Sequence, residues 1–356
     1  MRRVAAALGL LWLAAGLRGD ELALFSGREL EAAVGEASIA EEVVPFAPAA
    51  DMPPDSGDGE PKAVRRCVLF QCEPLPIEPA NRLFPKGAAI WTGAGVFLGF
   101  VDGFQNPLRY GFQPFHTTDE GFFSSYTYAG GADKASHAIV SENVAGLLYD
   151  AYILNGLTPD QAFALSLATT VVAGALVEVG DAVTPYGFSA QDLTADTIGA
   201  LTGALIRRGG LEDTIGFSIG KIPTTLPPEI VAGHFEGLGF DYSNEMYTGS
   251  LKLDGLSRRL DASLGPARYL QVSFAFLTKG FGYAPPIPSR YQEIGFEVGL
   301  NFPAILRGVG VSNETWWGDL LLRTFTFLRI PYTQVGAYYN LKNHRWYGPG
   351  APYHYE

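Results

Sequence analysis

Three ionisable residues stand close together where an apolar segment of the sequence begins. The stretch GGADKASHAIVSENVAG, residues 130–146, contains Asp133, Lys134 and His137. Asp133 and His137 are four positions apart, so in a helix they share one face. A carboxylate beside an imidazole can transfer protons or bind a metal ion, and a lysine can neutralise nearby carboxylates.

Two further acidic pairs stand at the ends of neighbouring apolar segments. Glu178 and Asp181 close the run SLATTVVAGALVEVGDAV, and Asp192 and Asp196 open the run QDLTADTIGALTGAL. Short connections favour antiparallel helices, so the end of one segment should lie near the starts of both its neighbours. The sequence therefore predicts one polar cluster at one end of a helical bundle. Its members are Asp133, Lys134, His137, Glu178, Asp181, Asp192 and Asp196.

This polar cluster has a structural and a chemical interpretation. Asp133 can be a helix N-cap, Lys134 a solvated surface charge, and His137 a hydrogen-bonded core residue. Glu178 is harder to explain in this way, because it ends an apolar run and a buried carboxylate needs a partner. We expect a carboxyl oxygen of Glu178 or Asp181 within hydrogen-bond reach of His137 or Lys134. The candidate ligands for a divalent metal ion are His137, Glu178 and Asp181, and the sequence identifies no other cofactor.

Four apolar segments are predicted to be helices. The first segment begins at Lys86, and the other three span about 133–155, 160–180 and 190–207. Gly95, Gly99 and Gly103 recur every four residues in the first segment, and Gly199 and Gly203 do so in the last. Small residues at this spacing give a helix a smooth face that can approach a neighbour closely.

After about residue 209 the hydrophobic pattern changes to the period of two that is typical of strands. The stretches RYLQVSFAFLT and RYQEIGFEVGLNF alternate apolar and polar residues, and Val272, Phe274 and Phe276 fall on the apolar side. We expect three to five strands in an antiparallel sheet whose apolar face is buried, with a short helix at about Trp316–Leu328. The predicted fold class is α+β, a bundle of about four apolar helices followed by an antiparallel β-sheet packed on it.

The N-terminus has the features of a secretory signal peptide. Arg2 and Arg3 precede an apolar core at Val4–Gly16, which is shorter than the ~20 residues that a spanning helix needs. The segment that follows is rich in Pro, Asp and Gly and lacks a periodic apolar face. The predicted organisation is a signal peptide at 1–19, a disordered linker at 20–62, an extended segment at 63–85, a helical domain at 86–208 and an antiparallel β-rich region at 209–356.

The chain has two cysteines, Cys67 and Cys72. After export the pair can close a small disulfide loop, and two buried free thiols are an equally consistent interpretation. A single C-x₄-C pair is a poor zinc site.

Composition restricts the classes of function. Charged residues make up 17% of the chain, hydrophobic residues 47%, and the net charge is −12. The low charge content favours a membrane or cell-envelope setting, and the acidic balance without a basic stripe excludes a nucleic-acid partner. Ser141 and Ser189 lack the G-x-S-x-G context of a hydrolase nucleophile, and no phosphate-binding motif occurs.

The motifs ADKASH, VEVGDA and YGFSAQDLTADTIGA, in this order, resemble the YfiM-like family of predicted periplasmic lipoproteins, a domain of unknown function. The stretches FHTTDEGFF and FLRIPYTQVGAYYNL resemble longer members, so the resemblance covers about residues 86–347. The chain departs from the family in lacking a lipobox cysteine, and Asp196 stands where longer members more often carry asparagine. The polar pattern is also weakly similar to that of VanZ-like membrane proteins. The resemblance implies an envelope location and no particular reaction.

Two functions are consistent with these features. The first is an exported, membrane-associated and non-catalytic envelope protein, in the periplasm or at the outer membrane, with its polar cluster at one end of a helical bundle. The second is a metal- or acid/base-dependent hydrolase that acts on an envelope lipid or polymer. A membrane or another envelope component is the expected partner in both.

Overall fold

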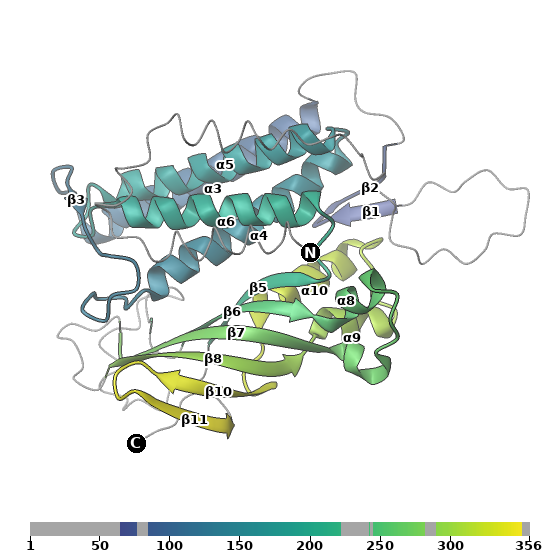
Figure 1. The fold of residues 1–356 in the computed structure, drawn as a ribbon. Coiled ribbons are helices and arrows are strands. Elements are labelled where there is room, and N and C mark those ends of the chain that lie inside the picture. The colour runs from purple at the N-terminus through teal and green to yellow at the C-terminus, as the bar shows by residue number, and fades with distance from the viewer. Residues whose placement is uncertain (1–64, 77–84, 222–241, 243–244, 282–289, 351–356) are drawn as a thin grey trace, which may run out of the picture. The chain divides into compact units, whose positions relative to one another are not determined.

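The computed structural model describes residues 65–76, 85–221, 242, 245–281 and 290–350 (Figure 1). The predicted signal peptide and the predicted linker lie outside these residues. After a short hairpin, the described chain forms a bundle of four helices and then a sheet, so the α+β prediction is confirmed. The helices of the bundle are α3 (Lys86–Tyr110), α4 (Ala132–Leu154), α5 (Pro159–Asp181) and α6 (Ala190–Arg208).

Capping residues explain where the helices begin. Thr158 and Gln161 form a reciprocal capping box at the start of α5, and the Ser189 hydroxyl accepts a hydrogen bond from the Asp192 amide at the start of α6. The start of α4 differs from the prediction. Its N-cap is Gly131, in the left-handed region at φ 82°, and no side chain caps this end. Asp133 is therefore not an N-cap, and its carboxylate is available for other contacts.

Helices α4 and α6 touch through their backbones. A Cβ atom added at Gly199 would lie 2.0 Å from the carbonyl oxygen of Ala138, and one added at Gly203 would lie 2.0 Å from that of Glu142. Helix α3 approaches α5 in the same way, because a Cβ at Gly103 would lie 2.3 Å from the Leu176 carbonyl oxygen. The glycine spacing in the sequence correctly indicated these close contacts.

Seven strands form the main sheet of the described residues, in the order β11-β10-β8-β7-β6-β5-β9. Neighbouring strands are antiparallel except β5 and β9, which run parallel, so the predicted antiparallel sheet is present but has more strands than the three to five expected. The strands are β5 (Ile215–Lys221), β6 (Glu245–Lys252), β7 (Leu270–Lys279), β8 (Tyr291–Leu300), β9 (Leu328–Arg329), β10 (Gln334–Asn340) and β11 (Arg345–Gly350). The connecting helices are α8 (Leu253–Arg259), η2 (Gly265–Tyr269), α9 (Phe302–Gly308) and α10 (Trp316–Phe327).

The apolar face of the sheet is only partly covered. Phe276 and Tyr247 pack in one cluster with Ala132 and Ile139 of α4, which joins the bundle to the sheet. Further along the strands the apolar side chains are exposed, contrary to the expected buried face. These exposed side chains include Val272, Phe274, Phe296, Val298, Leu300 and Val335.

The polar face of the sheet is the one that is buried. The Arg329 guanidinium donates to the Ser273 hydroxyl at 3.1 Å and pairs with the Glu297 carboxylate, which also accepts a hydrogen bond from Tyr338 at 2.8 Å. Only four residues connect β9 at one edge of the sheet to β10, which pairs with β8, so the sheet is strongly curled. Hydrogen bonds inside the curl therefore allow polar residues to occupy buried positions.

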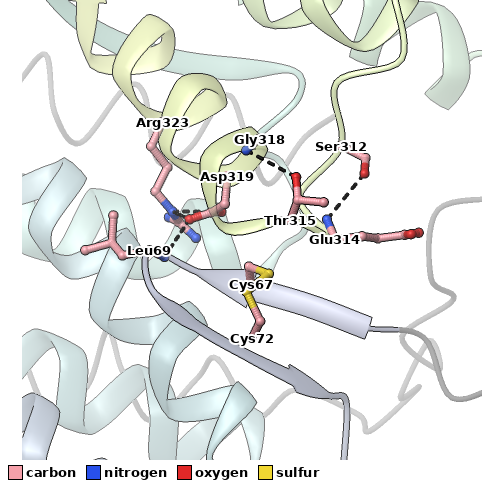
Figure 2. The surroundings of a disulfide bond; sticks show 9 residues. All are labelled: Cys67, Leu69, Cys72, Ser312, Glu314, Thr315, Gly318, Asp319 and Arg323. Carbon is pink, nitrogen blue, oxygen red and sulfur yellow. Dashed lines mark hydrogen bonds and ion pairs between the residues drawn. A yellow bond between two sulfur atoms is a disulfide. The ribbon is translucent and has the colours of Figure 1, made fainter.

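A short disulfide-closed hairpin precedes the bundle. Strands β1 (Arg65–Val68) and β2 (Gln71–Pro74) pair antiparallel, and a disulfide joins Cys67 to Cys72 within the predicted extended segment (Figure 2). The Leu69 amide donates to the Asp319 carboxylate at 2.7 Å, which also accepts from Arg323 on α10 (Figure 2). The hairpin is therefore fixed to α10, and the structure contains the disulfide rather than free thiols.

Asp150 of α4 is a buried carboxylate shared by three arginines. Its oxygens lie 2.9 Å from the Arg323 guanidinium, 3.2 Å from that of Arg207 and 3.7 Å from that of Arg66. Burial alone would raise the pKa of Asp150, but these three cations outweigh it and hold the pKa at about 2. The carboxylate thereby links α4 to α6, to α10 and to the hairpin.

The contact between α4 and α6 predicts a cost for adding a single methyl group. Gly199→Ala should lower the free energy of unfolding by roughly 1–3 kcal/mol, because the new Cβ would overlap the Ala138 carbonyl. Gly93→Ala on α3 is the matched control, since a Cβ there meets no atom within 4 Å. The control should be neutral or slightly stabilising, because alanine favours helix more than glycine does. Chemical denaturation followed by circular dichroism measures both, and equal stability of the two variants would contradict the close contact.

Candidate functional site

Lys134 lies at the centre of the polar cluster. Its ammonium nitrogen is 3.0 Å from an oxygen of Asp192 and 3.2 Å from an oxygen of Asp133, and it also donates to Glu120. Only 3% of its side chain is exposed, so the interpretation as a solvated surface charge is wrong. Burial works against the charge on Lys134, but the surrounding carboxylates outweigh it and raise the pKa of this lysine.

His137 lies one helical turn further along α4 and faces α6. Its Nδ1 atom is 3.1 Å from Oδ2 of Asp196, and its Nε2 atom is 3.7 Å from Oδ1 of Asp133. Burial would lower the pKa of His137, but the hydrogen bond to Asp196 and the charge of Asp133 raise it well above its ordinary value. In the absence of another cation, the imidazole is therefore protonated at neutral pH.

The same two aspartates also accept hydrogen bonds from hydroxyl groups. The Ser141 hydroxyl donates to Oδ1 of Asp196 at 2.7 Å, and the Tyr242 hydroxyl donates to Oδ1 of Asp133 at 2.7 Å. Burial would raise the pKa of Asp133, yet the charges of His137 and Lys134 lower it. Asp133 is therefore ionised at neutral pH.

Glu178 and Asp181 have partners other than the predicted ones. Glu178 is 1% exposed, and its Oε2 atom accepts the Ser189 amide at 3.0 Å. Asp181 accepts a hydrogen bond from the Asn106 amide at 2.6 Å. Among the described residues neither acid makes a hydrogen bond with His137 or Lys134, so that expectation is wrong, although Glu178 places an oxygen within 4.8 Å of a ring nitrogen of His137.

Burial sets the ionisation of the remaining acids. It raises the pKa of Glu178 to about 8 and that of Asp181 to about 6. Burial and the neighbouring charge of Asp133 raise the pKa of Asp192 to about 6. At neutral pH Glu178 is mostly protonated in the metal-free protein, which reduces the repulsion among so many acids.

The structure brings all seven predicted residues to one end of the bundle and adds members that the sequence did not reveal. Ser141 stands four residues after His137, a spacing that could have identified it. Glu120 belongs to a loop in which β3 (Thr117–Thr118) pairs with β4 (Phe188–Ser189), and no local pattern predicts this long-range pair. The further members of the site are Glu120, Ser141, Asn106 and Tyr242.

Two groups of side chains place donor atoms close enough together for one metal ion. Asp133, His137 and Asp192 form the first group, and His137, Glu178 and Asp196 form the second. In each group the donor atoms lie within 4.8 Å of one another. Asp181 belongs to neither group, so it is replaced by Asp196 in the candidate set that contains Glu178.

A cavity of about 570 Å³ lies beside the polar cluster, between α3 and the other three helices. Its polar end is lined by Asp133, His137, Asp192 and Asp196, with Tyr128 and Tyr242 close by. Its apolar part is lined by Leu98, Val101, Val140, Val144 and Val177. The cavity thus has the character of an amphipathic binding site, apolar along its length and charged at one end.

Helix α3 forms one wall of this cavity and presents large apolar side chains outward. Phe97, Phe100 and Phe104 are 61%, 49% and 46% exposed. By length and composition, α3 and α5 are two helices of the described chain that could cross a membrane, although the core helix of a soluble protein passes the same test. Only 17% of the most apolar window of α3 is buried, which distinguishes α3 from a core helix.

Comparison with known proteins finds a match over part of the chain. Residues 119–208 match a family model described as a predicted periplasmic lipoprotein (DUF2279). The match covers the loop that carries Glu120 together with α4, α5 and α6, so it includes the whole predicted cluster. It supports an exported, periplasmic location and agrees with the resemblance to predicted periplasmic lipoproteins, but it does not support the narrower YfiM-like or VanZ-like resemblance. No curated protein and no solved structure matches the chain.

Proposed function

We propose that this chain is an exported cell-envelope protein that lies against a membrane and holds an amphipathic lipid in the cavity beside α3. The observation that carries the proposal is the composition of the cavity wall. Leu98 and Val140 line the apolar part, and His137 lines the charged end. An acyl chain would lie along the apolar part, and the polar head would face His137.

The surface around the cavity supports membrane contact. The phenylalanines of α3 are exposed on the helix that forms one wall of the cavity, so a membrane in contact with them would lie beside the cavity. The sheet adds a second exposed apolar surface, since Phe274 and Phe296 point outward while Ser273 and Glu297 are buried. This apolar-out, polar-in alternation is typical of strands that face lipid in the outer membrane. We therefore propose an outer-membrane association, with export directed by the signal peptide at 1–19.

A hydrolase acting on an envelope lipid or polymer is the second candidate, because His137 and Asp196 pair as a general acid/base would. The serine beside them is not arranged as a nucleophile. The Ser141 hydroxyl donates to Asp196, and among the described residues it makes no hydrogen bond to His137. We therefore favour binding over covalent catalysis.

Filling the cavity tests the lipid proposal. Val140→Trp should reduce the lipid that copurifies with the protein at least several-fold, because the indole would occupy space that the acyl chain needs. Val172→Trp on α5 is the matched control, since Val172 is similarly exposed but does not line the cavity. Mass spectrometry of organic extracts measures the bound lipid per protein. Equal lipid content in both variants, or none in the wild type, would refute the proposal.

Removing the apolar surface of α3 tests membrane association. Changing Phe97, Phe100 and Phe104 together to serine should move the protein from the membrane fraction to the soluble fraction, because each exposed phenylalanine contributes about 1.5–3 kcal/mol when it enters lipid. The control changes the exposed Val309, Tyr332 and Trp346, which lie outside α3, to serine. Flotation of exported protein on liposomes compares the two. If both triple variants float with the liposomes as the wild type does, α3 is not the membrane contact.

A further inference from the structure

We propose that His137, Glu178 and Asp196 form a binding site for a divalent transition-metal ion. The three residues come from α4, α5 and α6, so the site lies where these three helices of the bundle meet. Their donor atoms lie within 4.8 Å of one another. This inference goes beyond the proposed lipid function and does not depend on it.

An unsatisfied atom at the site supports a bound ion. Glu178 is 1% exposed, and its Oε1 atom has no hydrogen-bond partner among the residues that the structure describes. Its other oxygen is held by the Ser189 amide, so the carboxylate cannot turn freely to find one. Leaving a buried polar atom unpaired costs about 1–3 kcal/mol, and a cation that binds Oε1 in place of a proton would remove this cost.

The alternative group, Asp133, His137 and Asp192, is less suited to a metal. The Lys134 ammonium lies 3.2 Å from Asp133 and 3.0 Å from Asp192, so it already neutralises both carboxylates. It makes no ion pair with Glu178 or Asp196 among the described residues. A cation bound by the group that contains Glu178 would therefore not compete with Lys134.

The geometry of His137 and Asp196 also fits coordination. Nδ1 of His137 and Oδ2 of Asp196 are 3.1 Å apart, close to the ~3 Å that separates adjacent ligands bound at about 2.1 Å to one metal ion. The remaining groups would orient these ligands, with Asp133 on the far side of the imidazole and Ser141 donating to the other oxygen of Asp196.

The donor set indicates the kind of ion. One imidazole nitrogen with two carboxylate oxygens suits Zn²⁺ or Mn²⁺ better than Ca²⁺, which prefers oxygen ligands alone. His137 and Asp196 both line the cavity, so a ligand in the cavity can complete the coordination.

Metal binding to the full-length protein tests the site. The protein is purified in detergent, stripped with a chelator and titrated with Zn²⁺ by calorimetry and with Co²⁺ by visible absorption. We expect one equivalent of either ion to bind. Glu178→Gln and Asp196→Asn should each weaken metal binding at least about 100-fold. Loss of a residue that only hydrogen-bonds to a ligand already weakens metal affinity about 10–100-fold, and loss of a ligand itself should weaken it at least as much. Asp181→Asn is the matched control and should bind like the wild type, because Asp181 is a half-buried acid of the same cluster that belongs to neither donor group.

Three results would overturn the proposal. The first is the absence of stoichiometric binding by the wild type, which needs no variant and is independent of variant folding. The second is binding that survives Glu178→Gln but is lost in Asp192→Asn, which would assign the ion to the other donor group. The third is equal weakening by Asp181→Asn and Glu178→Gln. Because the metal alone is the probe, each result is separate from the outcome of the lipid experiments.

Discussion

The backbone contact between α4 and α6 determines where the polar cluster forms. Gly199 and Gly203 have no Cβ atom, so α6 rests directly on the carbonyl groups of Ala138 and Glu142. Asp196 stands three residues before Gly199 on the same helical face, and this close packing places it against His137. The missing side chain of Gly174 on α5 leaves the space that the Asp196 carboxylate occupies, since a Cβ there would lie 2.5 Å from Oδ2. The site is thus a consequence of how tightly the helices pack.

That packing collects more carboxylates than cations, and the structure balances them in different ways. Lys134 neutralises the acids nearest to it, and the protonated His137 pairs with Asp196. Glu178 is left with a pKa of about 8, because burial penalises its charge more than His137 relieves it. One end of the bundle is therefore acidic, buried and adjacent to an apolar cavity. These properties support the proposed binding of an amphipathic lipid and of a metal ion.

Local patterns in the sequence predicted the parts of this structure that depend on local physics. Spacing of four residues placed Asp133 and His137 on one face, and the capping residues marked the helix ends. The partner of each acid was not predictable from local patterns. Glu178 accepts a hydrogen bond from the Ser189 amide, and Glu120 accepts one from Lys134, and in both cases a loop brings the partner to the site. The polarity of the sheet was misread for a related reason. Alternation in a strand gives two faces, and only the curl of the sheet decides which is buried.

The ionisation of His137 tests most directly whether α4 and α6 meet as described. NMR titration of the metal-free, ¹⁵N-histidine-labelled protein, with the signal assigned by a His137→Gln variant, measures its pKa. The contacts with Asp196 and Asp133 predict a pKa well above 6.5, which should fall in Asp196→Asn because its strongest partner loses its charge. A His137 that titrates near 6.5 in the wild type and does not respond to Asp196→Asn would contradict this arrangement of the two helices.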